Sequence, residues 1–180
     1  MLIPGGRDIP PEFYGQENNG SKIEEGAGFR YKFMSKIMQA LRKDMPIFGV
    51  CWGYQFLNIY FGGDLIQHIE NSPEHYKKRR FTVSKGSLLY EAVGEEIIGN
   101  CYHHQNLGVL GNKIKVTAYD DFSKTPHAFQ YEEEGTCIFA VLWHPESTKE
   151  DESGKKLTQK SLKLAKFFIN KCIEFKKKNN

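Results

Sequence analysis

Pro46-Ile47-Phe48-Gly49-Val50-Cys51-Trp52-Gly53-Tyr54-Gln55 is the stretch around which the rest of the chain is interpreted. Its apolar run, 47–50, follows a proline and is typical of a short buried strand. Beyond Gly53, apolar residues recur at helical spacing as far as Phe61, which predicts a helix. The sequence therefore predicts a strand, a tight turn and a helix, with Cys51 at the turn between two glycines.

This arrangement is typical of a nucleophile elbow, in which a sharp turn presents a reactive side chain. The flanking glycines leave room for the cramped backbone that such a turn requires. A thiol at a helix N-terminus lies at the positive end of the helix dipole, which favours the thiolate. The N–H of Trp52 is not used within the helix and can bind a developing oxyanion. Taken alone, the motif is equally compatible with a buried structural cysteine.

The composition is that of one domain over residues 1–180, because 180 residues with 39% hydrophobic content can form a substantial core. The net charge of +3 lies largely in the tail 176–178, which disfavours nucleic-acid binding. The cysteines are widely spaced and predict neither a zinc site nor a disulfide framework. Reduced thiols without a signal peptide or a long apolar span lead us to expect a cytoplasmic protein. The four cysteines are Cys51, Cys101, Cys137 and Cys172.

Hydrophobic patterning predicts helices and strands on both sides of the elbow. Helices are expected over 29–43, from a Ser87 cap to Val93, and along the C-terminal stretch, where docking on the sheet is favoured over a membrane surface. Strands are expected at 2–3, 65–69, 80–83, 96–102, 114–119, 128–131 and 136–143. The alternation predicts an α/β fold with a mostly parallel central sheet. The expected buried stripes are Phe29, Phe33, Ile37, Met38 and Leu41 in the first helix, and Leu157, Leu164, Phe168, Cys172 and Phe175 in the last.

A partner for the cysteine follows the nearly continuous apolar strand 136–143, in the sequence His144-Pro145-Glu146. A residue before proline is held in extended conformations, where residues two apart point the same way. His144 and Glu146 can therefore share a face, so that Glu146 orients the imidazole toward Cys51. In isolation, a surface pair at a strand end would be the favoured interpretation of the same residues.

Together these stretches resemble the class I glutamine amidotransferases, specifically the peptidase C26 group, which includes γ-glutamyl-γ-aminobutyrate hydrolase and γ-glutamyl hydrolase. The resemblance extends over residues 2–146 and implies a flavodoxin-like three-layer fold. The double histidine followed by Gln105 favours the γ-glutamyl hydrolases over the ammonia-supplying subunits. The stretches that carry it are 2–8 (LIPGGRD), 49–55 (GVCWGYQ), 61–65 (FGGDL), 102–105 (YHHQ) and 143–146 (WHPE).

The resemblance also implies a role for each matching residue. Cys51 would be the nucleophile, His144 the general base and acid, and Glu146 the residue that orients it. The oxyanion hole would be formed by Gly5, Gly6 and Trp52, and the γ-glutamyl pocket would be lined by Gln55, Tyr102, His103, His104 and Gln105. For His103 and His104, a strand-end pair bonded to the backbone remains an alternative. No metal or organic cofactor is implied.

The chain departs from the family at its start, because family members carry a strand, a helix and a second strand before the Pro-Gly-Gly loop. The hypothesis is thus a cysteine hydrolase of γ-glutamyl amides, N-terminally shortened, whose sheet edge is completed by a homodimer or a separate chain. One alternative is a glutaminase subunit that supplies ammonia to a synthetase. Another is an inactive split-gene fragment or interaction protein. The identity of the leaving amine stays open.

Overall fold

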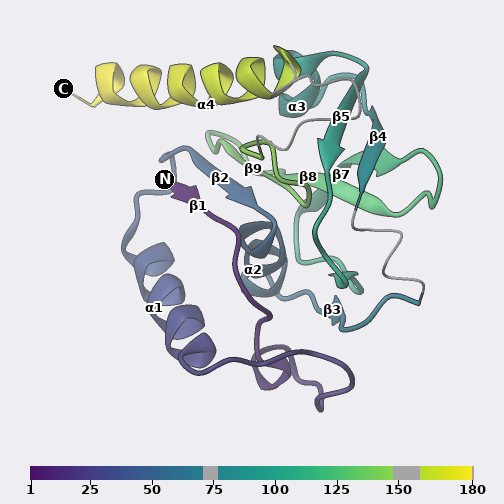
Figure 1. The fold of residues 1–180 in the computed structure, drawn as a ribbon. Coiled ribbons are helices and arrows are strands. Elements are labelled where there is room, and N and C mark those ends of the chain that lie inside the picture. The colour runs from purple at the N-terminus through teal and green to yellow at the C-terminus, as the bar shows by residue number, and fades with distance from the viewer. Residues whose placement is uncertain (71–76, 148–158, 180) are drawn as a thin grey trace.

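The computed structural model describes residues 1–70, 77–147 and 159–179. Within these residues the main sheet has seven strands in the order β1-β2-β9-β8-β7-β4-β5 (Figure 1). These strands are β1 (Leu2–Ile3), β2 (Ile47–Val50), β9 (Ile138–Val141), β8 (Pro126–Tyr131), β7 (Ile114–Asp120), β4 (Lys78–Val83) and β5 (Glu96–Asn100). A small antiparallel pair is formed by β3 (Leu65–Ile66) and β6 (Asn106–Leu107). The helices are η1 (Pro11–Tyr14), α1 (Ala27–Ala40), α2 (Trp52–Tyr60), α3 (Leu88–Val93) and α4 (Gln159–Lys178).

The sheet is mixed, with a parallel part and an antiparallel part. β2 pairs in parallel with β1 and with β9, whereas β9–β8, β8–β7, β7–β4 and β4–β5 are antiparallel. The predicted α/β class is confirmed, but the expectation of a mostly parallel sheet is wrong beyond β9. The connections β7–β8 and β8–β9 are short turns, and a parallel pairing needs a crossover of a dozen or more residues.

The parallel part of the sheet determines where functional residues gather. β1, β2 and β9 run in the same direction, so their carboxyl ends meet at one edge of the sheet. β1 leads into the loop 4–6, β2 ends at Val50, directly before Cys51, and β9 ends at Val141, shortly before His144. In open α/β sheets, ligands bind outside these carboxyl ends.

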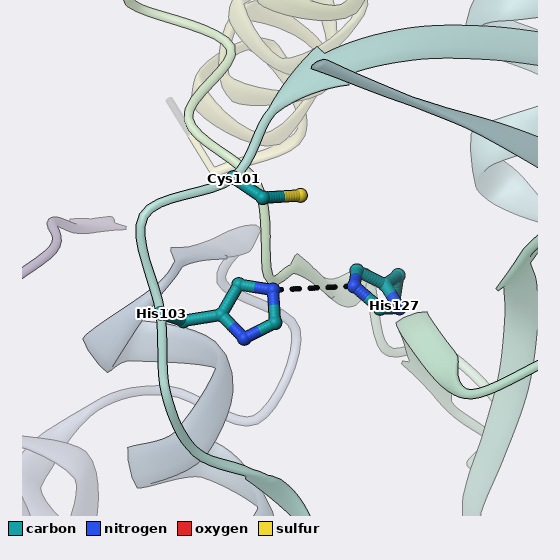
Figure 2. A group of neighbouring side chains, drawn as sticks. All are labelled: Cys101, His103 and His127. Atoms are coloured by element: carbon teal, nitrogen blue, oxygen red, sulfur yellow. Dashed lines mark hydrogen bonds between the residues drawn. The ribbon is translucent and has the colours of Figure 1, made fainter. Parts of the chain in front are cut away.

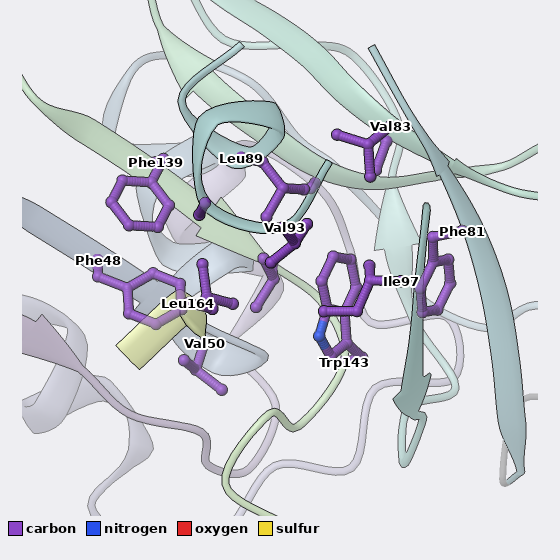
Figure 3. Packing of buried hydrophobic residues seen from close by; sticks show 14 of the residues in the cluster. Phe48, Val50, Phe81, Val83, Leu89, Val93, Ile97, Phe139, Trp143 and Leu164 are labelled. Atoms are coloured by element: carbon purple, nitrogen blue, oxygen red, sulfur yellow. The ribbon is translucent and has the colours of Figure 1, made fainter. Parts of the chain in front are cut away.

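Side chains alternate between the two faces of the sheet and build two apolar cores. On one face, Phe48 and Val50 of β2 pack with Leu164 of α4 and with α3, as the close view in Figure 3 shows. On the other face, Ile47 packs with α1 and α2. Figure 1 shows α3 and α4 on one side of the sheet and α1 and α2 on the other. The three-layer architecture is therefore as expected from the sequence.

Local predictions for the helices are confirmed at α3 and partly wrong at α1. Ser87 caps α3, accepting a hydrogen bond from the Tyr90 N–H at 3.0 Å. In α1, however, Phe29 and Phe33 are 73% and 52% exposed and stack on each other. The face that packs on the core carries Met38 and Leu41, as predicted, together with Tyr31 and Met34, which the predicted stripe did not include. Periodicity alone could not decide which apolar residues face the core.

The C-terminal helix docks on the sheet as expected, with Leu164 fully buried; Leu157 of its predicted stripe lies outside the described residues. Within the described part of the chain, none of the helices has the length and apolar character that crossing a bilayer requires.

Candidate active site

Cys51 occupies a strained turn between β2 and α2. Its backbone has φ 51° and ψ −101°, a conformation that side-chain-bearing residues rarely adopt. A Cβ on Gly49 would lie 2.8 Å from the Gly53 backbone, and one on Gly53 would lie 2.3 Å from the Ile3 carbonyl oxygen. The glycines on both sides of Cys51 are therefore needed for close backbone approach, as the elbow motif predicts.

His144 and Glu146 lie together at the end of β9. The Nδ1 of His144 is 2.7 Å from Oε1 of Glu146, and the backbone N–H of His144 donates to the Asn100 carbonyl at 2.8 Å. A methyl group built on Gly5 would lie 2.9 Å from Cε1 of His144 and 3.5 Å from Cβ of Cys51. Cys51, the imidazole and the Pro-Gly-Gly loop therefore meet at one point. With Nδ1 engaged by Glu146, Nε2 of His144 is the nitrogen available to the thiol.

The electrostatics of this cluster favour a charged pair. Burial lowers the pKa of His144, but hydrogen bonds to Cys51 and Glu146, together with their negative charges, raise it to about 10. Burial raises the pKa of Glu146, but the hydrogen bond and positive charge of His144 outweigh it and hold this pKa below the usual 4.5. An imidazolium between a thiolate and a carboxylate is the charge state expected of a cysteine nucleophile activated by histidine.

The segment 102–105 does not act as one unit. The ring of Tyr102 lies 5.5 Å from the ring of His144, between centroids. The Nε2 of His104 lies 2.9 Å from Oδ2 of Asp8, which ties the segment to the loop after β1. His103 and Gln105 are buried, at 3% and 1% exposure.

The two buried residues make hydrogen bonds to residues other than Cys51, His144 and Glu146. Nε2 of His103 lies 3.2 Å from Nε2 of His127, and the side-chain amide of Gln105 donates to Ser21 at 2.9 Å. Gln55, one turn into α2, is 4% exposed. Of the residues expected to line the pocket, Tyr102 is thus the one whose ring contacts the His144 ring.

Comparisons with known proteins identify the family of this chain. The family model of peptidase C26 matches residues 1–146. The chain belongs to the peptidase C26 family. It is 32% identical to a Mycobacterium tuberculosis protein provisionally named a glutamine amidotransferase, over 84% of this chain and 51% of that protein. A protein of Rickettsia prowazekii, provisionally named glutamine amidotransferase-like, is 40% identical over 93% of this chain and 77% of its own length.

Among solved structures, a Thermoplasma acidophilum protein that is provisionally named as part of a GMP synthase superposes with a TM-score of 0.71 at 18% identity. The match covers 99% of this chain and 74% of that structure, and it shows a shared fold. The present peptidase C26 family member spans about half the length of the Mycobacterium relative. The resemblance predicted from the motifs is confirmed at the level of the family.

In this peptidase C26 family member, Arg30 of α1 is a site residue that sequence reasoning missed. Its Nη2 donates to the carbonyl oxygens of Pro4 and Gly5 at 3.0 and 3.1 Å, and its guanidinium carbon lies 3.8 Å from the centre of the Trp52 ring. Burial lowers the pKa of Arg30, while the charge of Cys51 raises it. Arg30 therefore holds the Pro-Gly-Gly loop against the elbow and lies within electrostatic reach of Cys51.

Proposed function

We propose that this protein is a cysteine hydrolase that cleaves γ-glutamyl amide bonds. The observation that carries the proposal is the convergence of Cys51, in its strained elbow, with the His144–Glu146 pair and Gly5. Membership of the peptidase C26 family and relatives named as glutamine amidotransferases support the same chemistry. The γ-glutamyl preference rests on the motif resemblance.

In the proposed reaction the Cys51 thiolate attacks the side-chain carbonyl carbon of the substrate and a C–S bond forms. The carbonyl electrons move to oxygen, and N–H groups of Trp52 and the Gly5–Gly6 loop stabilise that oxyanion. The C–N bond then breaks, and the amine leaves with a proton from His144. Water, deprotonated by His144, attacks the resulting thioester, the C–S bond breaks, and glutamate leaves with its γ-carboxyl group free while the thiolate is restored.

Substrate recognition is proposed for residues around this point. Tyr102 is the strongest candidate for a pocket wall, because its ring lies beside His144. His104 is proposed to act with it, since its bond to Asp8 joins the segment 102–105 to the loop after β1. Gln55 is proposed to contribute from α2. His103 and Gln105 are proposed to support this wall from within the core.

The experiment pairs an activity assay with labelling. Hydrolysis of γ-glutamyl-p-nitroanilide is compared with that of its α-glutamyl isomer, in the unaltered protein, in Cys51→Ala and in Cys172→Ala as a matched control. We expect turnover of the γ-isomer that is lost only in Cys51→Ala. 6-Diazo-5-oxo-norleucine, followed by peptide mass mapping, is expected to label Cys51. Labelling of Cys101, Cys137 or Cys172 with Cys51 untouched would overturn the proposal.

The same assay separates the alternatives. A glutaminase subunit would hydrolyse free glutamine slowly and accelerate when a synthetase partner is added. An interaction protein or inactive fragment would bind without turnover and leave Cys51 unlabelled. Preference for the α-isomer would contradict γ-glutamyl specificity while leaving the cysteine mechanism intact.

A further inference from the structure

A second cluster of reactive side chains lies in the core, apart from the Cys51, His144 and Glu146 group. Cys101 and His103 follow β5 and His127 lies on β8; they are 0%, 3% and 0% exposed. One ligand atom of each lies within 4.8 Å of the other two. Figure 2 shows the sulfur of Cys101 beside the gap between the two imidazole rings. We refer to these three residues as the Cys-His-His cluster.

The hydrogen bonds of the two imidazoles determine what can lie between them. Nδ1 of His103 is 3.1 Å from the Gln105 carbonyl oxygen, and Nδ1 of His127 is 3.1 Å from that of Thr125. A carbonyl oxygen only accepts, so a hydrogen on each Nδ1 satisfies it and leaves a lone pair at Nε2 of each neutral ring. For His127 this carbonyl is a closer partner of Nδ1 than the Thr125 hydroxyl, which lies at 3.4 Å. The two Nε2 atoms face each other at 3.2 Å. Two lone pairs at that distance require a cation between them, either a proton or a metal ion.

The geometry fits a tetrahedral metal ion. With Zn–N bonds of about 2.05 Å, two ligating nitrogens of a tetrahedral site lie about 3.3 Å apart, close to the observed separation. A Zn–S bond of about 2.3 Å places the sulfur about 3.6 Å from each nitrogen, so each sulfur–nitrogen distance, which is at most 4.8 Å, needs to shorten by no more than about 1.2 Å. Metal-bound histidines also characteristically donate their second N–H to a carbonyl or carboxylate, as both rings do here.

Strand alternation connects the cluster to the active site. Residues two apart in an extended chain point to the same side, so Cys101 and His103 reach into the core while Tyr102 points the other way. The Tyr102 ring is the one that lies beside His144. The adjoining Asn100 carbonyl accepts from the His144 backbone N–H. An ion held by Cys101 and His103 would therefore fix the position of the neighbouring Asn100 carbonyl, to which the His144 backbone N–H donates.

We infer that Cys101, His103 and His127 form a structural site for a zinc-type divalent ion, which holds segment 101–103 against the core. The set of two imidazoles and one thiolate suits Zn²⁺ and Co²⁺ and is a poor match for Mg²⁺ or Ca²⁺. The three side chains supply three of the four tetrahedral positions. On binding, the ion displaces the thiol hydrogen of Cys101, which leaves to solvent as a proton. This inference does not depend on the proposed function.

The test uses Co²⁺ as a spectroscopic probe in the Cys51→Ala protein, so that the elbow thiol cannot contribute. The metal-free protein is titrated with Co²⁺ and then with Zn²⁺. We expect one Co²⁺ per chain, a thiolate-to-cobalt charge-transfer band, tetrahedral visible bands, and loss of all of these on displacement by Zn²⁺. Adding Cys101→Ser should abolish the charge-transfer band, and adding His127→Asn should weaken binding by about 100-fold or more. Cys137→Ser is the matched control and should change neither.

X-ray absorption of the Zn²⁺-loaded Cys51→Ala protein keeps the inference testable if a core variant fails to fold. One sulfur and at least two imidazole nitrogens around zinc are expected. Absence of sulfur from the shell would overturn the inference. So would a failure to bind stoichiometric Co²⁺, or a charge-transfer band that survives Cys101→Ser in folded protein.

Discussion

The backbone strain at the elbow makes an unusual prediction about two inactive variants. Cys51 has φ 51° and ψ −101°, and such a conformation costs a side-chain-bearing residue about 1–3 kcal/mol. Glycine adopts this conformation with little strain. It has more conformational entropy than alanine in the unfolded chain, however, and this lowers its free energy of unfolding by about 0.4–1 kcal/mol relative to alanine. Taking mid-range values, the free energy of unfolding of Cys51→Gly should exceed that of Cys51→Ala by about 1.3 kcal/mol.

Equilibrium urea unfolding measures this difference directly. Both tryptophans, Trp52 and Trp143, are buried, so their fluorescence reports the loss of tertiary structure, and circular dichroism checks that the transition is two-state. The matched control is Ala165→Gly in the Cys51→Ala protein. Ala165 is exposed in the interior of α4, where glycine is expected to lower stability by about 1 kcal/mol.

We expect glycine in place of alanine to raise the free energy of unfolding at position 51 and to lower it at position 165. If Cys51→Gly proves less stable than Cys51→Ala by the same margin as the Ala165 control, position 51 carries no strain. The interpretation of the elbow as a strained nucleophile turn would then be refuted, because glycine would be responding only to chain entropy.

The other predictions concern catalysis, charge and the open sheet edge. Cys51→Ala should abolish γ-glutamyl turnover and Glu146→Gln should leave slow turnover, because an orienting residue acts through the base; equal, total loss in folded variants would contradict these roles. The stability contributed by the raised pKa of His144 should be complete below about pH 6.5 and lost as pH rises through about 10. Glu146→Gln should lower that pKa, and an unchanged NMR titration midpoint would argue against the pair. Arg30→Met should lower kcat by about 10- to 100-fold through misplacement of the Pro-Gly-Gly loop, with stability followed in parallel; a kcat equal to that of the unaltered protein would contradict its positioning role. Leu2 is 55% exposed on the edge strand β1, so we expect self-association that Leu2→Lys weakens in sedimentation equilibrium; a monodisperse, thermally robust and fully active monomer would contradict it.

The parts of the fold that sequence could predict are those in which the signal is local. The elbow is determined by glycines within two residues of Cys51, and their close contacts involve the same turn and the adjacent strand. The cap of α3 likewise depends on Ser87 and a backbone N–H three residues later. The direction of β8 and the choice of stripe on α1 depend on which element lies opposite, which no local pattern contains.

The same distinction explains the candidate site. Cys51 and the His144–Glu146 pair could be predicted because each lies directly after an apolar strand, and parallel strands bring such ends together. Arg30 could not, because it reaches the Pro-Gly-Gly loop from α1, 26 residues from Pro4 along the chain, and carries no motif of its own.

The segment 101–105 shows how far a local rule extends. Alternation along an extended chain, already used to pair His144 with Glu146, also separates Tyr102 from its neighbours Cys101 and His103. Applied to this segment, the rule places Tyr102 on the side of Cys51 and His144 and places His103 on the opposite side. The rule could not have supplied His127, which joins the buried side only because β8 lies between β9 and β7. Sequence can therefore indicate which way a side chain points, whereas the partner it meets depends on the order of the strands.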